Sequence, residues 1–280
     1  MAGRLILCAT PIGNLGDIST RVLEALKEAD RIAAEDTRNS IKLLNHFDIR
    51  TPMISYHENN RYERGRELVD KMLKGETIAL ITDAGTPAIS DPGEALVAMA
   101  YEAGIEVTSL PGPAACITAL TLSGLPTRRF SMEGFLPRGK KERAEILQEL
   151  KEETRTMIIY EAPHHLKKTL QDLSDALGAD RRISLCRELT KIHEEVRRTR
   201  LGDACADDFA PRGEYVLVIE GKSREKRQKE AQLQWQDLTI QAHVERYLSK
   251  GMEEKDAMKQ VAKDRGIGKR DVYAALKKRN

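Results

Sequence analysis

Three short segments of the chain are rich in glycine and proline, in a pattern that could bind a ligand. They are ATPIGNLGDIS (9–19), TDAGTPAISDPG (82–93) and LPGPAACITALTLSGLP (110–126). None contains a lysine or an arginine, and the chain lacks the GxxxxGK(S/T) string of a nucleotide-phosphate loop. Gly13 and Gly16 supply only a GxxG fragment of a dinucleotide-binding fingerprint. The segments therefore indicate a ligand that is not a polyphosphate.

The acidic side chains narrow the class of ligand further. Asp83 and Asp91 suit a molecule with hydroxyl groups, an ammonium group or another positive centre. S-adenosylmethionine fits this description, because it joins an adenosine, an amino acid and a sulfonium without any phosphate. The alternative is that the glycines and prolines only form tight turns, which they favour in any protein.

The order of predicted strands and helices places these segments together. RLILCAT (4–10), TIALITD (77–83) and IEVTSL (105–110) read as buried strands, and each leads into one of the three segments. Amphipathic helical patterns alternate with the strands, which predicts a mainly parallel sheet covered by helices. Because open α/β sheets bind ligands at the carboxyl ends of their strands, we expect the three segments to share that edge.

The pattern changes after Pro126. Five strand candidates follow: FSMEGFL (130–136), TMIIYEA (156–162), ISLCREL (183–189), EEVRRTRL (194–201) and GEYVLVIEG (213–221), with helices at about 140–152 and 163–177. The short connection between ISLCREL and EEVRRTRL predicts an antiparallel pair and hence a mixed sheet. We expect an N-terminal α/β domain (1–120), a C-terminal α/β domain (121–222), a charged linker (223–235) and a small helical module (236–280).

The composition is that of a soluble globular protein. The chain has 280 residues, of which 40% are hydrophobic and 32% charged, enough for a large core in two domains. Apolar runs such as MIIY and VLVI are far shorter than the roughly 18 to 20 residues that span a bilayer. No secretory signal is recognisable at the N-terminus, so we expect a cytoplasmic protein that does not enter a membrane.

Neither metal binding nor disulfide formation is indicated. The four cysteines are widely separated, at Cys8, Cys116, Cys186 and Cys205, which excludes a CxxC metal pair and a dense disulfide framework. His164 and His165 do not form a metal site without further ligands nearby. We therefore expect reduced cysteines and no metal.

Basic residues gather in three groups, although the net charge is only +2. The first group is Arg128, Arg129, Arg138, Lys140, Lys141 and Arg143, the second is Arg197, Arg198 and Arg200, and the third is KSREKRQK (222–229). A single group of this kind is usually a solvated surface or a linker. Three in one chain also suit a phosphate-backbone partner, and the sequence leaves both interpretations open.

Nine strings that occur in order across residues 9–221 resemble a known family. They are ATPIGNLGDIS, AAEDTRNS, SYHENN, ITDAGTPAISDPG, LPGPAA, EGFLPR, IYEAPHHL, RELTK and GEYVLVIEG. This order is similar to the tetrapyrrole methylase superfamily, and within it to the family of ribosomal RNA small subunit methyltransferase I. Enzymes of that family use S-adenosylmethionine to methylate a cytidine 2′-hydroxyl in the decoding region of 16S ribosomal RNA. His165 stands where the family commonly has arginine, which puts a role for a cation there in doubt.

The resemblance implies a fold, partners and site residues. The fold is a two-domain α/β methylase with a mainly parallel N-terminal sheet, a mixed C-terminal sheet and a helical tail. The partners are 16S ribosomal RNA in the small ribosomal subunit and a second copy of the chain. The cofactor positions carried over by motif are Pro11, Gly13, Asp83, Gly85, Ile89, Ser90, Ala114, Ala115, Tyr160, Glu161, Leu189 and Gly213. For Ala114 and Ala115, tight helix packing is the competing explanation.

The resemblance implies that the methyl acceptor is a ribose hydroxyl, which is a weak nucleophile. A general base would therefore raise the rate of transfer by about 10²- to 10⁴-fold. The candidates are Glu35 and Asp36 in AAEDTR, and His57 and Glu58 in SYHENN, after the second and third predicted strands. Asp36 could instead pair with Arg38 or cap the following helix.

Two other functions and the role of the tail stay open. A methylase of the same superfamily could act on a tetrapyrrole or on a modified protein residue, but the basic groups would then have no purpose. A non-enzymatic RNA-binding protein would leave the large α/β body unexplained. The tail resembles a helix-turn-helix, with Lys269, Arg270, Lys277, Lys278 and Arg279 on or near its last helix. It is expected either to contact RNA or to support packing or dimerisation.

Overall fold

The computed structural model describes residues 3–207 and 212–277, which form two compact units. The first unit spans Met1–Leu150 and Arg155–Glu220, and it contains both predicted sheets. The second unit takes Lys151–Thr154 and Gly221–Asn280. Among the residues described, every helix is too short or too polar to cross a bilayer.

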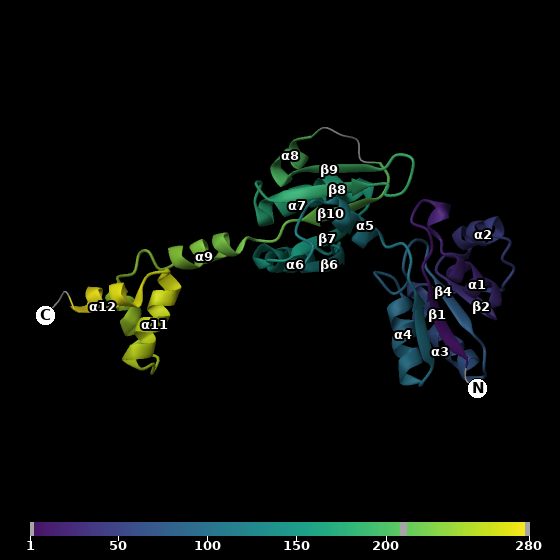
Figure 1. Ribbon diagram of the computed structural model, residues 1–280, viewed down its shortest axis with the longest axis horizontal. Helices are drawn as coiled ribbons and strands as arrows, with labels where there is room; N and C mark the ends of the chain where they lie inside the picture. Colours follow the sequence, from purple (N-terminus) through teal and green to yellow (C-terminus); the bar gives the residue numbers. More distant parts are fainter. Residues whose placement is uncertain (1–2, 208–211, 278–280) are drawn as a thin grey trace. The chain divides into compact units, whose positions relative to one another are not determined.

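The first sheet has five parallel strands, as the alternating pattern predicts. They are β1 (Arg4–Cys8), β2 (Arg31–Ala34), β3 (Met53–Ser55), β4 (Ile78–Ile81) and β5 (Glu106–Leu110), in the order β3-β2-β4-β1-β5 (Figure 1). Ile6 in β1 lies opposite Ala79 of β4 and Thr108 of β5. All five strands therefore end at one edge, and the three glycine-rich segments begin there.

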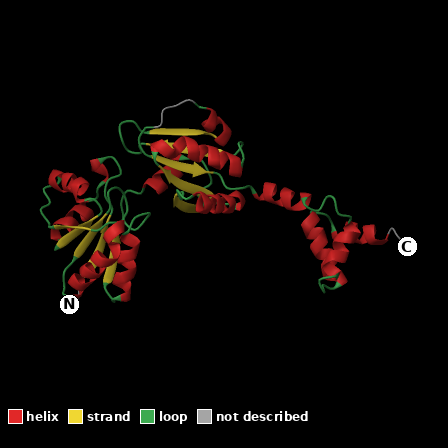
Figure 2. Cartoon of the chain, turned by 180° about the vertical axis from the view of Figure 1, so that it is seen from behind, coloured by secondary structure: helices red, strands yellow, loops and turns green. Residues whose placement is uncertain are grey.

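Helices cover both faces of this sheet (Figure 2). One face packs against α1 (Thr20–Glu28) and α2 (Thr37–His46), and the other against α3 (Arg61–Leu73) and α4 (Gly93–Glu102). Side chains alternate between the faces, so Ile6 joins Val22 and Leu26 of α1, whereas Leu7 joins Leu68 of α3 and Leu96 of α4. The near-continuous apolar strands follow from burial on both sides.

The second sheet is mixed, also as predicted. Its strands are β6 (Phe130–Phe135), β7 (Thr156–Glu161), β8 (Arg182–Arg187), β9 (Glu195–Arg200) and β10 (Tyr215–Ile219), in the order β6-β7-β10-β8-β9. β6 and β7 are parallel, and the remaining pairs are antiparallel. The pair formed by β8 and β9 confirms the antiparallel connection expected from the short loop between them.

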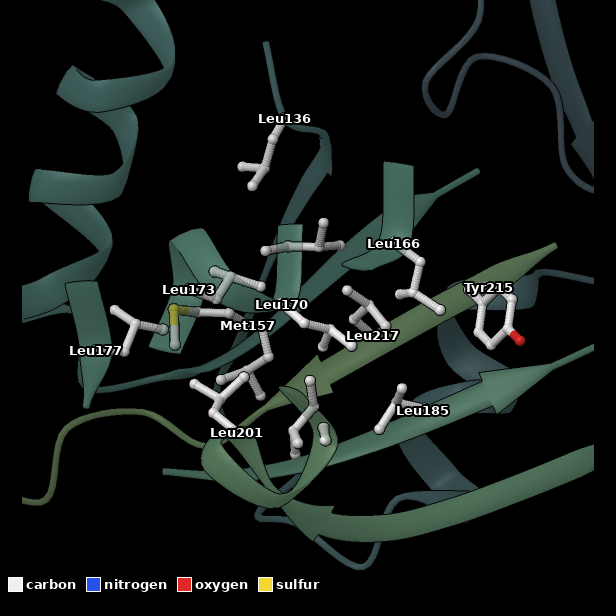
Figure 3. Close-up of a cluster of buried hydrophobic side chains, with 14 of the residues drawn as sticks. Leu136, Met157, Leu166, Leu170, Leu173, Leu177, Leu185, Leu201, Tyr215 and Leu217 are labelled. Atoms are coloured by element: carbon white, nitrogen blue, oxygen red, sulfur yellow. The ribbon is translucent and has the colours of Figure 1, made fainter. Parts of the chain in front are cut away.

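Different helices cover the two faces of the second sheet. The helices α6 (Lys140–Glu152), α7 (Pro163–Leu177) and α8 (Leu201–Ala206) cover one face. Figure 3 shows how Leu166, Leu170 and Leu173 of α7 gather with Met157 and Leu217 in one buried cluster. The other face packs against α5 (Ala115–Leu122), which follows β5 of the first sheet in the chain. The segment 110–115 therefore leaves the first sheet and enters a helix of the second.

The second unit contains four helices among the described residues. They are α9 (Arg224–Leu233), α10 (Ile240–Leu248), α11 (Glu254–Arg265) and α12 (Lys269–Lys277). The last three lie in the segment predicted as a small helical module (236–280), and they enclose a small core that includes Val244, Val261 and Val272. Most of the segment predicted as a charged linker (223–235) is helical, because the sequence of α9, REKRQKEAQL, contains good helix formers and no glycine or proline. Lys278 and Arg279 lie outside the described residues.

Candidate functional site

The three glycine-rich segments are tied to one another at the carboxyl edge of the first sheet. Thr10 and Gly85 form an antiparallel bridge, with N···O distances of 2.9 and 3.1 Å. The Thr86 hydroxyl donates to the carbonyl of Pro113 at 2.9 Å. Gly85 has a φ of +87°, and a Cβ there would lie 3.2 Å from Cγ2 of Ile12. Glycine is needed at this position for both its backbone conformation and its lack of a side chain.

The loop TDAGTPAISDPG is shaped by the carboxylate of Asp91. Its Oδ1 accepts from the backbone N–H groups of Ala88 (3.0 Å) and Gly93 (2.7 Å), and its Oδ2 accepts from that of Ile89 (3.2 Å). Ala88 and Ser90 both have a positive φ, 66° and 63°, which non-glycine residues rarely adopt. Asp91 therefore holds a strained loop in place.

A cavity of about 510 Å³ lies within the first unit, where these segments face the second sheet. Its charged lining consists of six carboxylic acids and one lysine: Glu35, Asp83, Asp91, Glu161, Glu188, Glu214 and Lys191. So acidic a lining would repel a polyphosphate and attract positive groups. S-adenosylmethionine, with its sulfonium and ammonium, fits this charge distribution, and the volume is within the range of small-molecule sites.

The one lysine of the lining is neutralised by two carboxylates. Lys191 Nζ lies 3.0 Å from Oε1 of Glu188 and 3.1 Å from Oε2 of Glu214. Burial alone would raise the pKa of Glu188, but the backbone N–H of Glu214 and the Lys191 ammonium hold this pKa below its usual value. Glu188 has a φ of +50°, and a Cβ at Gly213 would come within 2.5 Å of its side chain. Gly213 thus makes room for Glu188.

A buried network supports the acid Glu161 on the second sheet. Its Oε1 accepts from the backbone N–H of Ala162 at 2.8 Å, and its Oε2 accepts from the hydroxyl of Thr169. That hydroxyl accepts in turn from Nη2 of Arg143 at 2.8 Å, while Nε of Arg143 donates to Asp172 at 2.7 Å. Because a guanidinium can only donate, the hydroxyl hydrogen of Thr169 is directed to Glu161. The carboxyl group is thereby fixed at the wall of the cavity.

Apolar side chains from both sheets form the rest of the wall. Ile12 and Ile89 come from the first half, and Leu189 and Tyr160 come from the second. Burial raises the pKa of Tyr160, so its phenol stays neutral. Its ring centroid lies 5.6 Å from that of Phe135 at the end of β6. The apolar surface formed by Ile12, Ile89, Leu189 and Tyr160 suits the adenine of a nucleoside.

Nine of the twelve predicted cofactor residues line the cavity. They are Asp83, Gly85, Ile89, Ser90, Ala114, Ala115, Tyr160, Glu161 and Leu189. Pro11, Gly13 and Gly213 are not part of the lining. Gly13 packs against the segment 189–191, since a Cβ there would lie 3.0 Å from the carbonyl oxygen of Leu189.

The four candidate bases occupy different positions. Glu35 lines the cavity and accepts a hydrogen bond from the Thr82 hydroxyl at 2.8 Å. Asp36 binds the side chain and backbone N–H of Arg38, and these hydrogen bonds lower its pKa to about 2. Asp36 therefore does both things that the sequence analysis offered as alternatives to catalysis: it caps α2 and pairs with Arg38.

His57 and Glu58 are not part of the cavity lining. The backbone N–H of His57 donates to Oδ1 of Asn60 at 2.8 Å, and Glu58 pairs with Arg61 at 2.6 Å. Both residues therefore belong to the short 3-10 turn (Glu58–Asn60) that precedes α3 rather than to the cavity wall.

In two of the recognised strings, sequence reasoning missed side chains that line the cavity, although it selected Leu189 in the second. EGFLPR supplies Phe135, and RELTK supplies Glu188 and Lys191. Both strings were recognisable as motifs, but neither offers a glycine-rich turn or an unusual spacing that would single out those side chains. The region 213–215 was also expected to close the pocket, and its Glu214 and Tyr215 line the cavity. Other lining residues that were not selected are Ile12, Thr82, Ala84, Thr86, Cys116, Ala162, Pro163, Cys186 and Val216.

Comparison with known proteins decides the family. Residues 4–205 match the family model Tetrapyrrole (Corrin/Porphyrin) Methylases. The chain belongs to the tetrapyrrole methylase family. A curated relative from Halalkalibacterium halodurans, named Ribosomal RNA small subunit methyltransferase I, is 50% identical over 97% of this chain and 93% of its own length. A relative of the same name from Bacillus subtilis is 45% identical over 98% and 94% of the two chains.

Solved structures of the tetrapyrrole methylase family share this fold. The crystal structure of diphthine synthase matches with a TM-score of 0.63 at 16% identity, covering 78% of this chain and 90% of the other. The predicted family, the predicted α/β fold and the predicted class of S-adenosylmethionine-dependent methyltransferase are thereby confirmed.

Proposed function

We propose that this methylase transfers a methyl group from S-adenosylmethionine to the ribose 2′-hydroxyl of a cytidine in the decoding region of 16S ribosomal RNA. The observation that carries the proposal is the 50% identity, over 97% of the chain, to a relative named Ribosomal RNA small subunit methyltransferase I. The acidic cavity supports it, because its charge suits a sulfonium cofactor and leaves the RNA phosphates outside.

The bound cofactor would supply an electrophilic methyl group. The chain's own contribution is mainly positioning, which can lower a barrier by roughly 7 to 11 kcal/mol. Asp83, Glu161 and Glu188 would hold positive and hydroxyl groups, and the small side chains of Ala114 and Ala115 would allow close approach at the start of α5.

Glu35 is the candidate base that the geometry favours. It is the only one of the four candidates in the cavity lining, and a carboxylate oxygen remains available beyond its bond to Thr82. Asp36 is a poor base, because an acid with a pKa of about 2 that is already paired with Arg38 accepts a proton reluctantly near neutral pH.

The proposal includes the cellular setting and the assembly. We place the enzyme in the cytoplasm, as a homodimer acting on the small ribosomal subunit. The tail is proposed to contact RNA, since Lys269 and Arg270 are exposed at the start of α12. Removing residues 230–280 should then weaken binding to the small subunit and leave cofactor affinity unchanged. Equal subunit binding by the shortened chain would leave packing or dimerisation as the tail's role.

The deciding experiment offers labelled S-adenosylmethionine and small subunits that lack the modification. Label is expected on the 2′-oxygen of one cytidine. Asp83→Ala should weaken cofactor binding in calorimetry, whereas Asp175→Ala, on an exposed position of α7, should not. No labelling by folded protein of naked RNA, immature particles or mature subunits would refute the RNA acceptor. Label on a tetrapyrrole or a modified protein residue would favour the alternative acceptors.

A further inference from the structure

The structure separates the basic residues that are already paired from those that are free to bind a partner. In the group on β9, Arg197 pairs with Asp207, and Arg198 and Arg200 donate to backbone carbonyl groups of neighbouring segments. Lys222, in the third group, is buried against two glutamates. Each of these cations already has a partner within the fold.

The loop between β6 and α6 is different. Arg143, inside α6, is only partly exposed and forms an ion pair with Asp172. Arg138, Lys140 and Lys141 are exposed, and their side chains form no ion pair or hydrogen bond among the residues described. Three uncompensated cations within four positions are a strong local attraction for an anionic chain.

An aromatic ring precedes these cations directly. Phe135 ends β6 and lines the cavity, yet 59% of it is exposed. A β-bulge between Met132 and Gly134 shifts the register of β6 on β7, and Gly134 adopts a φ of +65° to form it. Bulges redirect the side chains that follow them. Tyr160 packs against only part of the ring, so a flat apolar surface remains open at the mouth of the cavity.

We propose that Phe135, Arg138, Lys140 and Lys141 form a docking surface for single-stranded RNA at the mouth of the cavity. The ring stacks on a base of the nucleotide that is methylated or of its neighbour, and the three cations bind the adjoining phosphates. This inference rests on the proposed function and specifies which surface of the chain holds the acceptor strand.

The charge of the cavity supports this arrangement. An acceptor ribose has to bring one hydroxyl to the cofactor, but its flanking phosphates cannot enter a space lined by six carboxylic acids. The phosphates therefore have to run along the rim. Arg138 lies three residues from Phe135, so their backbones are at most about 10 Å apart. Unstacked bases on aromatic rings and phosphates on cations are the usual means of holding single-stranded RNA.

The same strand offers matched controls at its other end. Phe130 is also an exposed phenylalanine of β6, and it follows the exposed Arg128 and Arg129. The test variants are Phe135→Ala and the triple change R138Q/K140Q/K141Q, and the controls are Phe130→Ala and R128Q/R129Q. Thermal melts establish that each full-length variant is folded.

Two binding measurements test the surface. Affinity for a single-stranded RNA oligonucleotide of the decoding region is measured by fluorescence anisotropy at several salt concentrations, and affinity for S-adenosylmethionine is measured by calorimetry. The triple variant should bind RNA more weakly. Each lost phosphate contact reduces the magnitude of the slope of log association constant against log salt by roughly 0.7, so the loss of three contacts should reduce it by about 2. Phe135→Ala should weaken RNA binding by at least about five-fold without a change in slope.

The outcomes distinguish this inference from the function on which it rests. Test variants that bind RNA as well as their controls would overturn the docking surface. So would a Phe135→Ala variant that loses cofactor affinity and keeps RNA affinity, because the ring would then belong to the cofactor wall. A wild-type chain that neither binds the cofactor nor methylates RNA would reject the proposed function, and the surface with it.

Discussion

Replacing Thr169 by valine isolates the hydroxyl that joins Arg143 to Glu161. The hydroxyl is fully buried, donates to Oε2 of Glu161 and accepts from Nη2 of Arg143. Valine keeps the shape and the branched Cβ of threonine inside α7, so packing changes little. The substitution therefore removes two hydrogen bonds to charged groups and little else.

The magnitude follows from these two bonds. A hydrogen bond to a charged group contributes about 1.5 to 3 kcal/mol, and a buried group that loses its partner costs a similar amount. Burial of the extra methyl group of valine stabilises the fold by about 0.8 kcal/mol and offsets part of this loss. We expect the free energy of unfolding to fall by about 2 to 5 kcal/mol. For a unit of this size, that lowers the melting temperature by about 4 to 20 °C.

Cofactor binding should also weaken, because Glu161 retains only its bond from the backbone N–H of Ala162. A carboxyl group that is free to rotate loses part of a charge-assisted contact, and a loss of about 1 kcal/mol corresponds to roughly five-fold weaker affinity. Calorimetry with S-adenosylmethionine measures this change, and thermal melts measure the change in stability.

Two control variants separate the hydroxyl from other effects. Thr169→Ser keeps the hydroxyl and loses only a methyl group, so its cofactor affinity should stay close to that of the wild type. Thr118→Val removes a hydroxyl that only bonds back to the carbonyl of Ala114 in its own helix, and it should change stability by less than about 0.5 kcal/mol. Equal cofactor affinity in Thr169→Val and the wild type would refute the coupling to Glu161. An equal loss in Thr169→Ser would show that the hydroxyl is not its cause.

Three further changes are predicted. Gly85→Ala and Gly104→Ala both force alanine to a positive φ, 87° and 69°, and should each cost about 1 to 2 kcal/mol of stability. Only Gly85→Ala, whose Cβ would lie 3.2 Å from a neighbouring loop, should also weaken cofactor binding in calorimetry. Asp91→Ala should lower cofactor affinity by releasing three backbone N–H groups, with Asp91→Asn intermediate; wild-type affinity in both would contradict this role for the carboxylate. Burial lowers the pKa of His243, so the unfolded chain takes up its proton more readily, and the second unit should lose stability as the pH falls below about 6.5. Fluorescence of the only tryptophan, Trp235, whose ring stacks on His243 with centroids 3.8 Å apart, should report a lower melting temperature at pH 5.5 than at pH 7.5, and His243→Gln should remove the difference.

Sheets, helices and their order were predictable because they depend on local patterns. The limit of those patterns appears in the loop RELTK. Glu188 and Thr190 adopt positive φ values of 50° and 65°. Neither is a glycine or an asparagine, so the residue types in this loop do not predict its backbone conformation. Contacts with distant segments impose this backbone: the N–H of Glu214 binds the side chain of Glu188, and Gly13 leaves space for the backbone of Leu189. Side chains placed in this way can only be found from the folded chain.

The two aspartates of TDAGTPAISDPG show the same limit on a smaller scale. The sequence gives both the same chemistry, yet Asp91 is occupied by three backbone N–H groups. Asp83 accepts from the backbone of Asp36 and the side chain of Asn39, with distances of 3.2 and 3.3 Å, and its side chain remains exposed at the cavity. One aspartate therefore shapes the loop, and the other is left to meet a ligand.

The charge of the cavity also explains why two surfaces are needed. At an effective dielectric constant of 20, a phosphate 4 Å from one carboxylate is repelled by about 4 kcal/mol, and the cavity presents six carboxylic acids. An acceptor strand can therefore reach the methyl group only through its hydroxyl, and its phosphates require a separate basic surface. Changes at Asp83 or Glu161 should then affect the cofactor first, and changes at Arg138 or Lys141 the RNA. If both sets of variants lost both ligands equally, the division between an acidic cavity and a basic rim would be wrong.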